Sequence, residues 1–428
     1  MADELTSPEQ VIAAMVLPEN RRNPYPFYDA LRAFGNLIHV KPGLTVAVGY
    51  EECTRVLRDP RLRVQDEHSF DLAFPDWRSH SSLRGFTNSM LYRNPPDHTR
   101  MRALVSGAFT PRRLREVQPI IEDITDRLLD QTAELGADGT PVDLMAEFAF
   151  RLPVGVISEL LGVSPRDQDW FRAMAAEVMI ALEGVTNDQL QRANAAMDGL
   201  NTYLADLIAH CRRNPGDDLL TALVQVRDAD GGGIGQDELL GNLVLLLTAG
   251  FDTTTHLLGH CVLQAIEEPD FAERLRVDED FVPGYVEETL RHEPPVQATS
   301  RWADRDVDLL GTTIPADTKV LAIMAAGNRD PRRYPDPHRF DPDRKDVQPL
   351  SFAAGIHFCI GAPLARLETR IALPRLLRRF PKLDLAGTPT YRDRWLVRGH
   401  DHFPVRIGPE ASDLYHGTKN ASQERRHR

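Results

Sequence analysis

The sequence is poor in cysteine, with four residues among 428 and no Cys-x-x-Cys spacing. A long chain without a secretion signal is not expected to carry a disulfide framework. We therefore expect three of the four, Cys53, Cys211 and Cys261, to be ordinary buried thiols. The fourth, Cys359, lies in an unusual neighbourhood that is considered below.

Long apolar runs are also absent. The most apolar long segment, residues 239–251, is interrupted by glycines and polar residues. It is too short for a membrane span, which needs about 20 apolar residues. The first residues form neither a basic nor an apolar signal region. We therefore predict a cytoplasmic protein with no membrane partner.

Positive charge is in deficit, because 50 basic residues face 63 acidic ones and the net charge is −13. A basic nucleic-acid footprint is thus missing, and no nucleic-acid partner is expected. No linker-like stretch or repeat divides the chain, although 42% of it is hydrophobic. We predict an irregular segment over residues 1–23, one catalytic domain over 24–408, and a polar, disordered tail over 409–428.

Hydrophobic periodicity predicts a mainly α protein with a small β-rich region. One helix of 33 residues is expected over 236–268, and others over 281–293 and 359–380. Residues 37–50 alternate around a Lys-Pro-Gly turn and predict a β-hairpin. Residues 60–95 have no sustained period and predict a long functional loop. Its apolar members are expected either to line a pocket or to pack on the core: Phe70, Phe74, Trp77 and Phe86.

The sharpest local signal is the segment 352–366, FAAGIHFCIGAPLAR. Small residues at 353–355 permit a tight turn, and Cys359 follows at the start of a helix. Backbone N–H groups and the helix dipole favour a thiolate at such a position, and Gly361 would let the backbone approach the sulfur. On these features alone, a buried structural cysteine and a cysteine nucleophile remain open.

The whole segment resembles the haem-binding signature of the cytochromes P450, Phe-x-x-Gly-x-His-x-Cys-x-Gly followed by Leu-Ala-Arg. The resemblance implies that Cys359 ligates the iron of haem b and that His357 contacts a propionate. It also implies the P450 fold, with haem between the long central helix and the cysteine helix. Ala353 departs from the commoner glycine, and we expect it to keep a negative φ. The resemblance adds three cofactor-binding residues: Phe352, Gly355 and Gly361.

A second motif lies inside the long helix, where residues 249–254 read Ala-Gly-Phe-Asp-Thr-Thr. Glycine and β-branched residues are poor choices for a helix interior, so either a packing defect or a local bulge is expected. The resemblance implies that Asp252 and Thr253 are the acid–alcohol couple that delivers protons to dioxygen. It also implies that Ala249 and Gly250 contact the cofactor.

Two further motifs support the resemblance. Glu288 and Arg291 match its Glu-x-x-Arg pair, and Arg339 would complete a structural triad that holds the coil before the cysteine. The run Asn94-Pro-Pro-Asp-His-Thr-Arg-Met-Arg102 and a later arginine resemble contacts to the haem propionates. The residues that carry this role are His98, Arg102 and Arg301.

The function implied by the resemblance is a haem-thiolate monooxygenase that uses O2 and two electrons. Electrons would come from NAD(P)H through a ferredoxin reductase and a ferredoxin, which four arginines would help to dock: Arg112, Arg113, Arg366 and Arg370. The substrate would be a medium-to-large apolar molecule, free or carrier-bound, of polyketide or related secondary metabolism, as in antibiotic biosynthesis. Its pocket would include Phe86, Met90, Met174, Leu245, Thr248, Ala249, Gln297, Ala298 and Leu396.

Two alternatives remain open at this point. An enzyme of oxidative coupling or of peroxide-driven oxidation would keep the same haem site. A haem-thiolate sensor or binding protein would also need Cys359 but no proton relay, so Asp252 and Thr253 argue against it.

Overall fold

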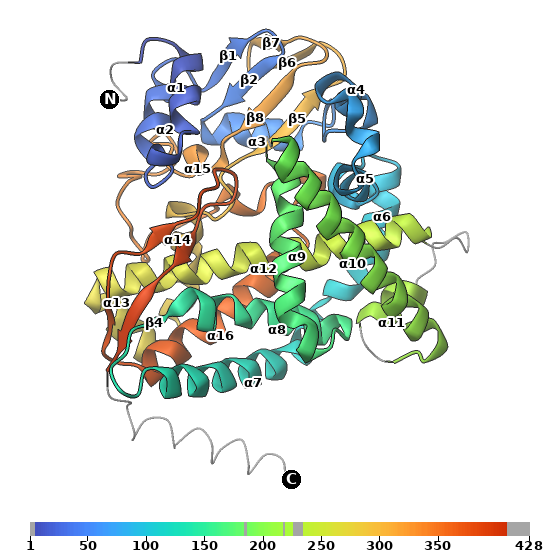
Figure 1. The fold of residues 1–428 in the computed structure, drawn as a ribbon. Helices are drawn as coiled ribbons and strands as arrows, with labels where there is room; N and C mark the ends of the chain where they lie inside the picture. The colour runs from blue at the N-terminus through green and yellow to red at the C-terminus, as the bar shows by residue number, and fades with distance from the viewer. Residues whose placement is uncertain (1–4, 184–185, 217–218, 226–233, 409–428) are drawn as a thin grey trace.

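The computed structural model describes residues 5–183, 186–216, 219–225 and 234–408. Helix α12 (Gln236–Glu267) is its central element and crosses the whole molecule (Figure 1). Its 32 residues correspond to a length of about 48 Å at 1.5 Å per residue. Most of its side chains are buried on every side, as expected of a core helix. The long helix predicted over 236–268 is confirmed.

Two apolar clusters pack against different halves of α12. The N-terminal half, with Leu243 and Val244, meets a cluster that includes Phe86 and Met197. The C-terminal half joins a second cluster around Leu257 and its neighbours. The helices of the first cluster are α5 (Ser81–Thr87), α6 (Asp97–Ser106), α9 (Gln168–Met179), α10 (Asn187–Arg213) and α11 (Leu219–Gln225). Those of the second are α7 (Pro111–Leu135), α8 (Arg151–Leu161), α13 (Pro269–Val277), α14 (Phe281–His292) and α16 (Ala362–Arg379).

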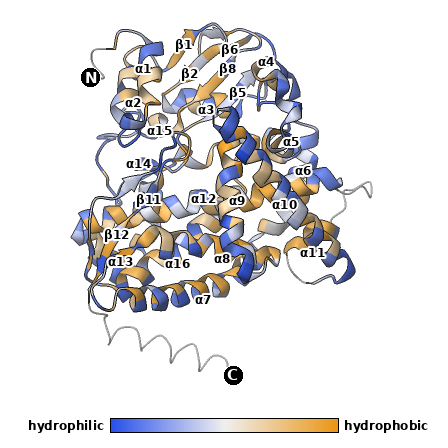
Figure 2. Ribbon diagram, in the orientation of Figure 1, coloured by the Kyte–Doolittle hydropathy of each residue, from blue (hydrophilic) through white to orange (hydrophobic). Residues whose placement is uncertain are grey.

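The stretch of α12 between the two clusters is polar, and it holds Asp252, Thr253 and His256. Hydrophilic and hydrophobic residues alternate along surface helices such as α7 (Figure 2). On a surface helix the polar residues face solvent, but the middle of α12 is buried, so contact with water does not explain its polar residues. It therefore marks the position where a functional site is expected.

The β-rich region lies at one end of the molecule, beside the N-terminal helices (Figure 1). Its main sheet has the strand order β1-β2-β8-β5-β3, in which only β2 and β8 pair in parallel. The predicted hairpin over 37–50 is confirmed by β1 (Leu37–Lys41) and β2 (Leu44–Ala47). The other strands of this sheet are β3 (Leu62–Arg63), β5 (Thr299–Ala303) and β8 (Lys319–Ala322).

Three smaller sheets complete the architecture. They pair β6 (Val307–Leu309) with β7 (Thr312–Ile314), β10 (Thr390–Tyr391) with β11 (His400–His402), and β12 (Pro404–Ile407) with both β4 (Val142–Asp143) and β9 (Leu383–Leu385). Short helices of the described chain include α2 (Tyr25–Arg32), α3 (Tyr50–Arg58) and α15 (Met324–Gly327). The mainly α class with a small β-rich region is thus confirmed.

Two predictions of irregular structure are wrong. Residues 1–23 contain α1 (Pro8–Met15), which Ser7 caps by accepting from the N–H of Gln10 and whose Val11 and Met15 are buried. A capping serine followed by proline is a helix-start signal, but it precedes only eight residues.

The loop predicted over 60–95 contains α4 (Glu67–Ala73), capped by Asp66, as well as α5. Phe70, Trp77 and Phe86 are buried in the first cluster, where Phe74 packs against them. The tail predicted over 409–428 lies outside the described residues. In the described part of the chain, no helix combines the length and apolar content that crossing a membrane requires.

Candidate active site

Cys359 lies between two short helical turns and the long helix α16. Its N–H donates to the carbonyl of Phe352 (2.9 Å), and α16 begins three residues later at Ala362. Cys359 is exposed, whereas Cys53, Cys211 and Cys261 are buried as predicted. Desolvation of the sulfur by the surrounding protein raises the pKa of the Cys359 thiol, and the backbone N–H groups of Gly361 and Ala362 oppose this rise.

The two glycines of this loop differ in what they do. Gly355 has φ +73°, and a Cβ there would lie 2.6 Å from the carbonyl oxygen of Leu57 on α3, so only glycine fits. At Gly361 a Cβ would lie 3.9 Å from the sulfur of Cys359, which is an ordinary contact. The backbone N–H of Gly361 does approach the sulfur, as expected, but this approach does not depend on the absence of a side chain at that position.

Ala353 does not keep the negative φ that we expected. Its φ of 58° and ψ of −159° fall in a region that is essentially reserved for glycine. The cause is the tight return of the chain, since the N–H of Ala353 donates to the carbonyl of Leu350 (2.7 Å). Alanine at this position therefore stores backbone strain directly before the cysteine loop.

Replacing Ala353 with glycine is expected to raise the free energy of unfolding by about 1 kcal/mol. The relief of strain, of order 1–3 kcal/mol, outweighs the extra entropy of glycine in the unfolded chain, which is below about 1 kcal/mol. The matched control is Ala354→Gly, because Ala354 is extended (φ −153°) and buried, so glycine there should lower the stability. Urea unfolding of both variants measures the difference in the free energy of unfolding. An equal loss of stability in both variants would contradict the inference that the backbone is strained at Ala353.

A cluster of four basic side chains lies beside the cysteine loop: His98, Arg102, Arg301 and His357. The rings of His98 and His357 are 4.0 Å apart. Burial, assisted by the positive charges of Arg102 and Arg301, lowers the pKa of His98 to about 4. Burial also lowers the pKa of His357 to about 2, assisted by His98 and the same two arginines. Burial also lowers the pKa of Arg301 to about 10.

This basic cluster lacks a matching anion among the described residues. Arg301 is almost completely buried and uses one N–H on the carbonyl of Ser300, while Arg102 donates to the carbonyl of Phe358 (2.7 Å). Nε2 of His357 is buried without a hydrogen-bond partner in the described chain. Arg301 is a buried positive charge and Arg102 a half-buried one, while the two histidines are neutral hydrogen-bonding groups at pH 7. A buried charge requires a negative partner, so the cluster is suited to receive carboxylates.

In the polar stretch of α12, Asp252 forms a buried ionic cluster. Its Oδ1 accepts from Nη1 of Arg392 (2.8 Å) and lies 3.5 Å from Nε2 of His256. Although burial alone would raise the pKa of Asp252, Arg392 and His256 together hold it well below its usual range. Asp252 is therefore a carboxylate at neutral pH. No sequence pattern pointed to Arg392, which lies 140 residues away from Asp252 in a loop.

Thr253 follows Asp252 on the same helix. Its hydroxyl donates to the carbonyl of Ala249 (2.9 Å), and the hydroxyl of Thr254 donates to that of Gly250 (3.1 Å). Such back-bonding occupies the hydroxyls within the helix. The helix is assigned as α throughout Gln236–Glu267, so the local bulge that we considered is not present.

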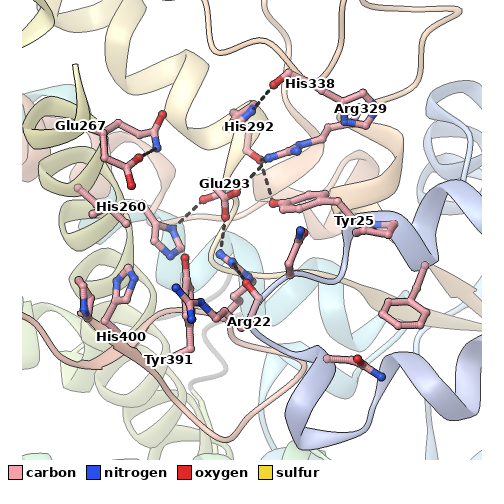
Figure 3. Close-up of a pocket in the computed structure, with 18 of the residues that line it drawn as sticks. Arg22, Tyr25, His260, Glu267, His292, Glu293, Arg329, His338, Tyr391 and His400 are labelled. Atoms are coloured by element: carbon pink, nitrogen blue, oxygen red, sulfur yellow. Dashed lines mark hydrogen bonds and ion pairs between the residues drawn. The ribbon is translucent and has the colours of Figure 1, made fainter. Parts of the chain in front are cut away.

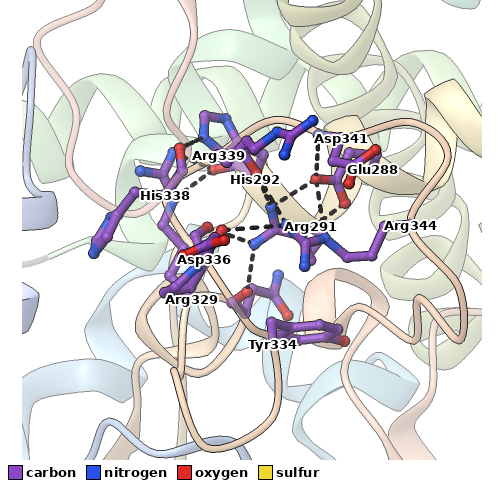
Figure 4. A network of polar contacts seen from close by, with 12 residues as sticks. Glu288, Arg291, His292, Arg329, Tyr334, Asp336, His338, Arg339, Asp341 and Arg344 are labelled. Atoms are coloured by element: carbon purple, nitrogen blue, oxygen red, sulfur yellow. Dashed lines mark hydrogen bonds and ion pairs between the residues drawn. The ribbon is translucent and has the colours of Figure 1, made fainter.

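The predicted structural triad is correct for two of its three members. Glu288 and Arg291 are both fully buried and form two hydrogen bonds of 2.7 Å each. Arg339 contributes only its carbonyl, which accepts from Arg291 (3.0 Å), while Arg344 brings the second guanidinium to Glu288 (3.4 Å). Figure 4 shows these contacts meeting at Arg291. The exposed side chain of Arg339 was the wrong choice because the coil turns it outward.

Comparison with known proteins assigns a family to this arrangement. The family model described as Cytochrome P450 matches residues 61–390. The chain belongs to the cytochrome P450 family. The chain is therefore an oxidoreductase of the P450 monooxygenase type, and its cofactor is haem with a cysteine thiolate ligand.

The similar proteins cover nearly the whole chain. A vitamin D(3) 25-hydroxylase of Pseudonocardia autotrophica is 40% identical over 91% of this chain and 95% of its own length. A 6-deoxyerythronolide B hydroxylase of Saccharopolyspora erythraea is 39% identical over 85% of this chain and 90% of its own. The crystal structure of P450BioI with an acyl carrier protein that bears hexadec-9Z-enoic acid has a TM-score of 0.84 and 33% identity, over 91% of this chain and 99% of that one.

The residues of this P450 fit its cofactor. Haem carries two propionate carboxylates, and the basic cluster offers four positively charged or hydrogen-bonding groups that lack an anion among the described residues. An exposed cysteine lies directly beside it. Both requirements of a thiolate-ligated haem, a soft sulfur ligand and anchors for two carboxylates, are thus met by adjacent residues.

The residues predicted to line the substrate pocket of the P450 fall into two groups. Phe86, Met90, Leu245 and the partly buried Met174 and Ala249 belong to the first apolar cluster, whereas Ala298 and Leu396 belong to a separate one beside β1 and α2. Thr248 is buried and donates to the carbonyl of Val244 (2.8 Å).

The side-chain amide of Gln297 is held by the protein itself. Its Oε1 accepts from the hydroxyl of Tyr28 (2.7 Å), and its Nε2 donates to the carbonyl of Pro294 (2.6 Å). The side chain is fully buried and both ends of its amide are engaged. Gln297 therefore braces the chain between α14 and β5 with both ends of its amide, and its place in the substrate pocket stays a prediction.

The four arginines predicted to dock a ferredoxin on this P450 are paired with carboxylates of its own chain. Arg112 and Arg113 contact Glu116 (3.0 and 3.2 Å), and Arg366 and Arg370 contact Glu287 (2.5 and 3.5 Å). These ion pairs reduce the positive potential that the sequence alone suggested.

Proposed function

We propose that this P450 uses O2 and two electrons from a ferredoxin and its reductase to hydroxylate or epoxidise a medium-to-large apolar natural product of polyketide type. The observation that carries the site is the basic cluster beside the exposed Cys359, with no carboxylate among the described residues to neutralise it. The substrate class rests on the apolar residues near α12 and on the relatives.

In this proposal Cys359 would ligate the haem iron, and the basic cluster of His98, Arg102, Arg301 and His357 would hold the propionates. Five further residues would contact the cofactor: Ala249 and Gly250 of α12, and Phe352, Gly355 and Gly361 of the cysteine segment. When bound, thiolate-ligated haem supplies the activation of dioxygen.

Asp252 and Thr253 move the protons that this reaction consumes. Asp252 stays ionised, because Arg392 and His256 stabilise its charge, so it does not store a proton. It instead accepts one and passes it on at once. Oδ2 is the atom available for this, since it is buried and has no hydrogen-bond partner among the described residues, whereas Oδ1 is bound to Arg392. The hydroxyl of Thr253 extends the relay by exchanging its bond to the Ala249 carbonyl.

The apolar side chains of the first cluster that approach the middle of α12 exclude water and orient the substrate: Phe86, Met90, Met174 and Leu245. The similar proteins are named for a deoxyerythronolide, vitamin D3 and a carrier-bound hexadecenoic acid, all of which are largely apolar. We place a polyketide first because a 6-deoxyerythronolide B hydroxylase is among the similar proteins.

The test begins with the purified ferric protein, titrated with macrolactone polyketides, secosteroids and fatty acids while the haem spin state is recorded. A low-to-high-spin shift with macrolactones, followed by a product carrying one oxygen atom from labelled dioxygen, is the expected result. A coupled product without new oxygen would favour the coupling enzyme, and product formed only with peroxide would favour peroxide-driven oxidation.

A further inference from the structure

A line of buried polar atoms leads away from Asp252 along α12. It comprises Oδ2 of Asp252, Nδ1 of His256, Nε2 of His260 and both ring nitrogens of His400, which we call the histidine line. All four residues are at most 2% exposed, and none of these atoms has a hydrogen-bond partner in the described part of the protein. Asp252, His256 and His260 are spaced by four, so they share one face of the helix.

The members of the line are close neighbours. Nε2 of His256 lies 3.5 Å from Asp252, and the opposite edge of its ring faces the chain before β11, since a Cβ on Gly399 would lie 2.1 Å from its Nδ1. His400 comes directly after that glycine. The rings of His400 and His260 are 5.5 Å apart and nearly perpendicular.

The far end of the histidine line reaches a cavity of about 1540 Å³ that is separate from the cysteine loop. His260 and His400 line this cavity together with Gln264 and Glu267, the next members of the same helix face. Figure 3 shows His260 and His400 side by side at its wall. Exposure rises along this face, from the buried His260 through the half-buried Gln264 to the exposed Glu267. The line therefore connects Asp252 with a solvent-reaching cavity.

Unpaired polar atoms in a protein interior are ordinarily satisfied by ordered water. The imidazoles are suited to hold such water because they stay neutral. Burial lowers the pKa of His260 to about 3 and that of His400 to about 2, although Glu293 opposes this. Arg398 and the other histidines add to the lowering, and Asp252, Arg392 and Asp401 are the charges that face His256. A neutral ring offers one donor and one acceptor.

The tautomer of His260 sets the direction of these bonds. Its Nδ1 lies 2.9 Å from the carbonyl of Glu293, so Nδ1 carries the proton and donates. Nε2 is consequently an acceptor that faces no donor among the described residues. A water molecule that donates to Nε2 retains a second hydrogen for its next neighbour, as a chain of proton transfer requires.

We infer that the histidine line is a hydrated path that carries protons from the cavity to Oδ2 of Asp252. This inference rests on the proposed role of Asp252 in proton delivery. The reaction consumes two protons for each dioxygen: RH + O2 + 2 e⁻ + 2 H⁺ gives ROH + H2O. The buried Asp252 must therefore be resupplied, and the histidine line is the polar route to the cavity that the described structure offers it.

The first test needs no substrate. A high-resolution crystal structure of the haem-loaded protein is expected to show ordered waters within hydrogen-bond distance of His256 Nδ1, His260 Nε2 and His400. The same structure of His260→Leu should lose the waters nearest that ring. A dry line in the wild-type protein would overturn the inference, whatever substrate the enzyme proves to use.

The second test compares two oxidants on the compound that gives the largest spin-state shift. Hydrogen peroxide brings both protons with it: RH + H2O2 gives ROH + H2O. For His260→Leu we expect a roughly tenfold fall in the dioxygen-driven rate, below the ~10²–10⁴-fold contribution of a general acid itself, and a larger solvent deuterium isotope effect. The peroxide-driven rate should stay within about twofold of the wild type.

Matched variants separate proton supply from structure. His260→Gln keeps a polar group that can bind water and should restore most of the dioxygen-driven rate, and His338→Leu alters an exposed histidine of the same cavity and should change neither rate. His400→Leu and His400→Gln repeat the comparison if His260→Leu folds poorly. Equal losses with both oxidants, or an unchanged rate in both leucine variants, would overturn the inference. Absence of any labelled product from the wild type would instead count against the proposed function.

Discussion

Replacing Arg291 with methionine is expected to lower the free energy of unfolding by about 3–5 kcal/mol, because it leaves the carboxylate of Glu288 buried without its main counter-charge. Both side chains are fully buried, and both oxygens of Glu288 accept from Arg291 at 2.7 Å. Arg291 also donates to the carbonyls of Asn328 and Pro337, which no other group replaces in the described network.

The same variant should weaken haem retention. Arg291 holds the carbonyl of Asn328, and the side chain of Asn328 in turn accepts from the N–H of Leu350 (2.7 Å) and donates to Ser351 (2.9 Å). These residues begin the turn that leads to Cys359. Loss of Arg291 therefore loosens the cysteine loop through Asn328, which contacts both Leu350 and Ser351.

Chemical denaturation of three variants measures the effect. Arg344→Met should cost less, about 1–2 kcal/mol, because its guanidinium is farther from Glu288 at 3.4 Å. Arg339→Met should change stability by no more than about 0.5 kcal/mol, since its exposed side chain makes no contact with Glu288 in the described structure. If Arg339→Met proved as costly as Arg291→Met, the network drawn in Figure 4 would be wrong.

The elements that the sequence predicted correctly are those with long or well-punctuated patterns. Helix α12 has a continuous apolar pattern, and the β1–β2 hairpin has alternation around a Pro-Gly turn. Helix α14 ends just before Pro294-Pro295. Helices α1, α4 and α5 were missed because seven or eight residues give too few turns for a period to emerge.

The residues of the candidate site also divide into those that the sequence predicts and those that only tertiary packing reveals. Cys359, His357 and Gly355 lie within one contiguous motif, so the sequence alone could group them. Arg392 and Arg344 were missed because their contacts to Asp252 and Glu288 span 140 and 56 residues and depend on tertiary packing. The positive φ of Ala353 and the engaged amide of Gln297 are likewise set by neighbours in space.

The second large effect is expected at Cys359 itself. Alanine there removes the sulfur that we propose as the axial ligand, so haem should lose its thiolate character and oxygenation should cease. The chain supplies its own matched controls, because Cys53, Cys211 and Cys261 are buried thiols in apolar clusters. Alanine at each of these three positions changes packing but not ligation.

The most direct test of the account is the absorption spectrum of the reduced, carbon monoxide-treated protein in these four variants. We expect the thiolate–CO band in the wild type and in Cys53→Ala, Cys211→Ala and Cys261→Ala, and its loss in Cys359→Ala. Persistence of the band in Cys359→Ala, or its loss in one of the other three while that variant still binds haem, would contradict the assignment of Cys359.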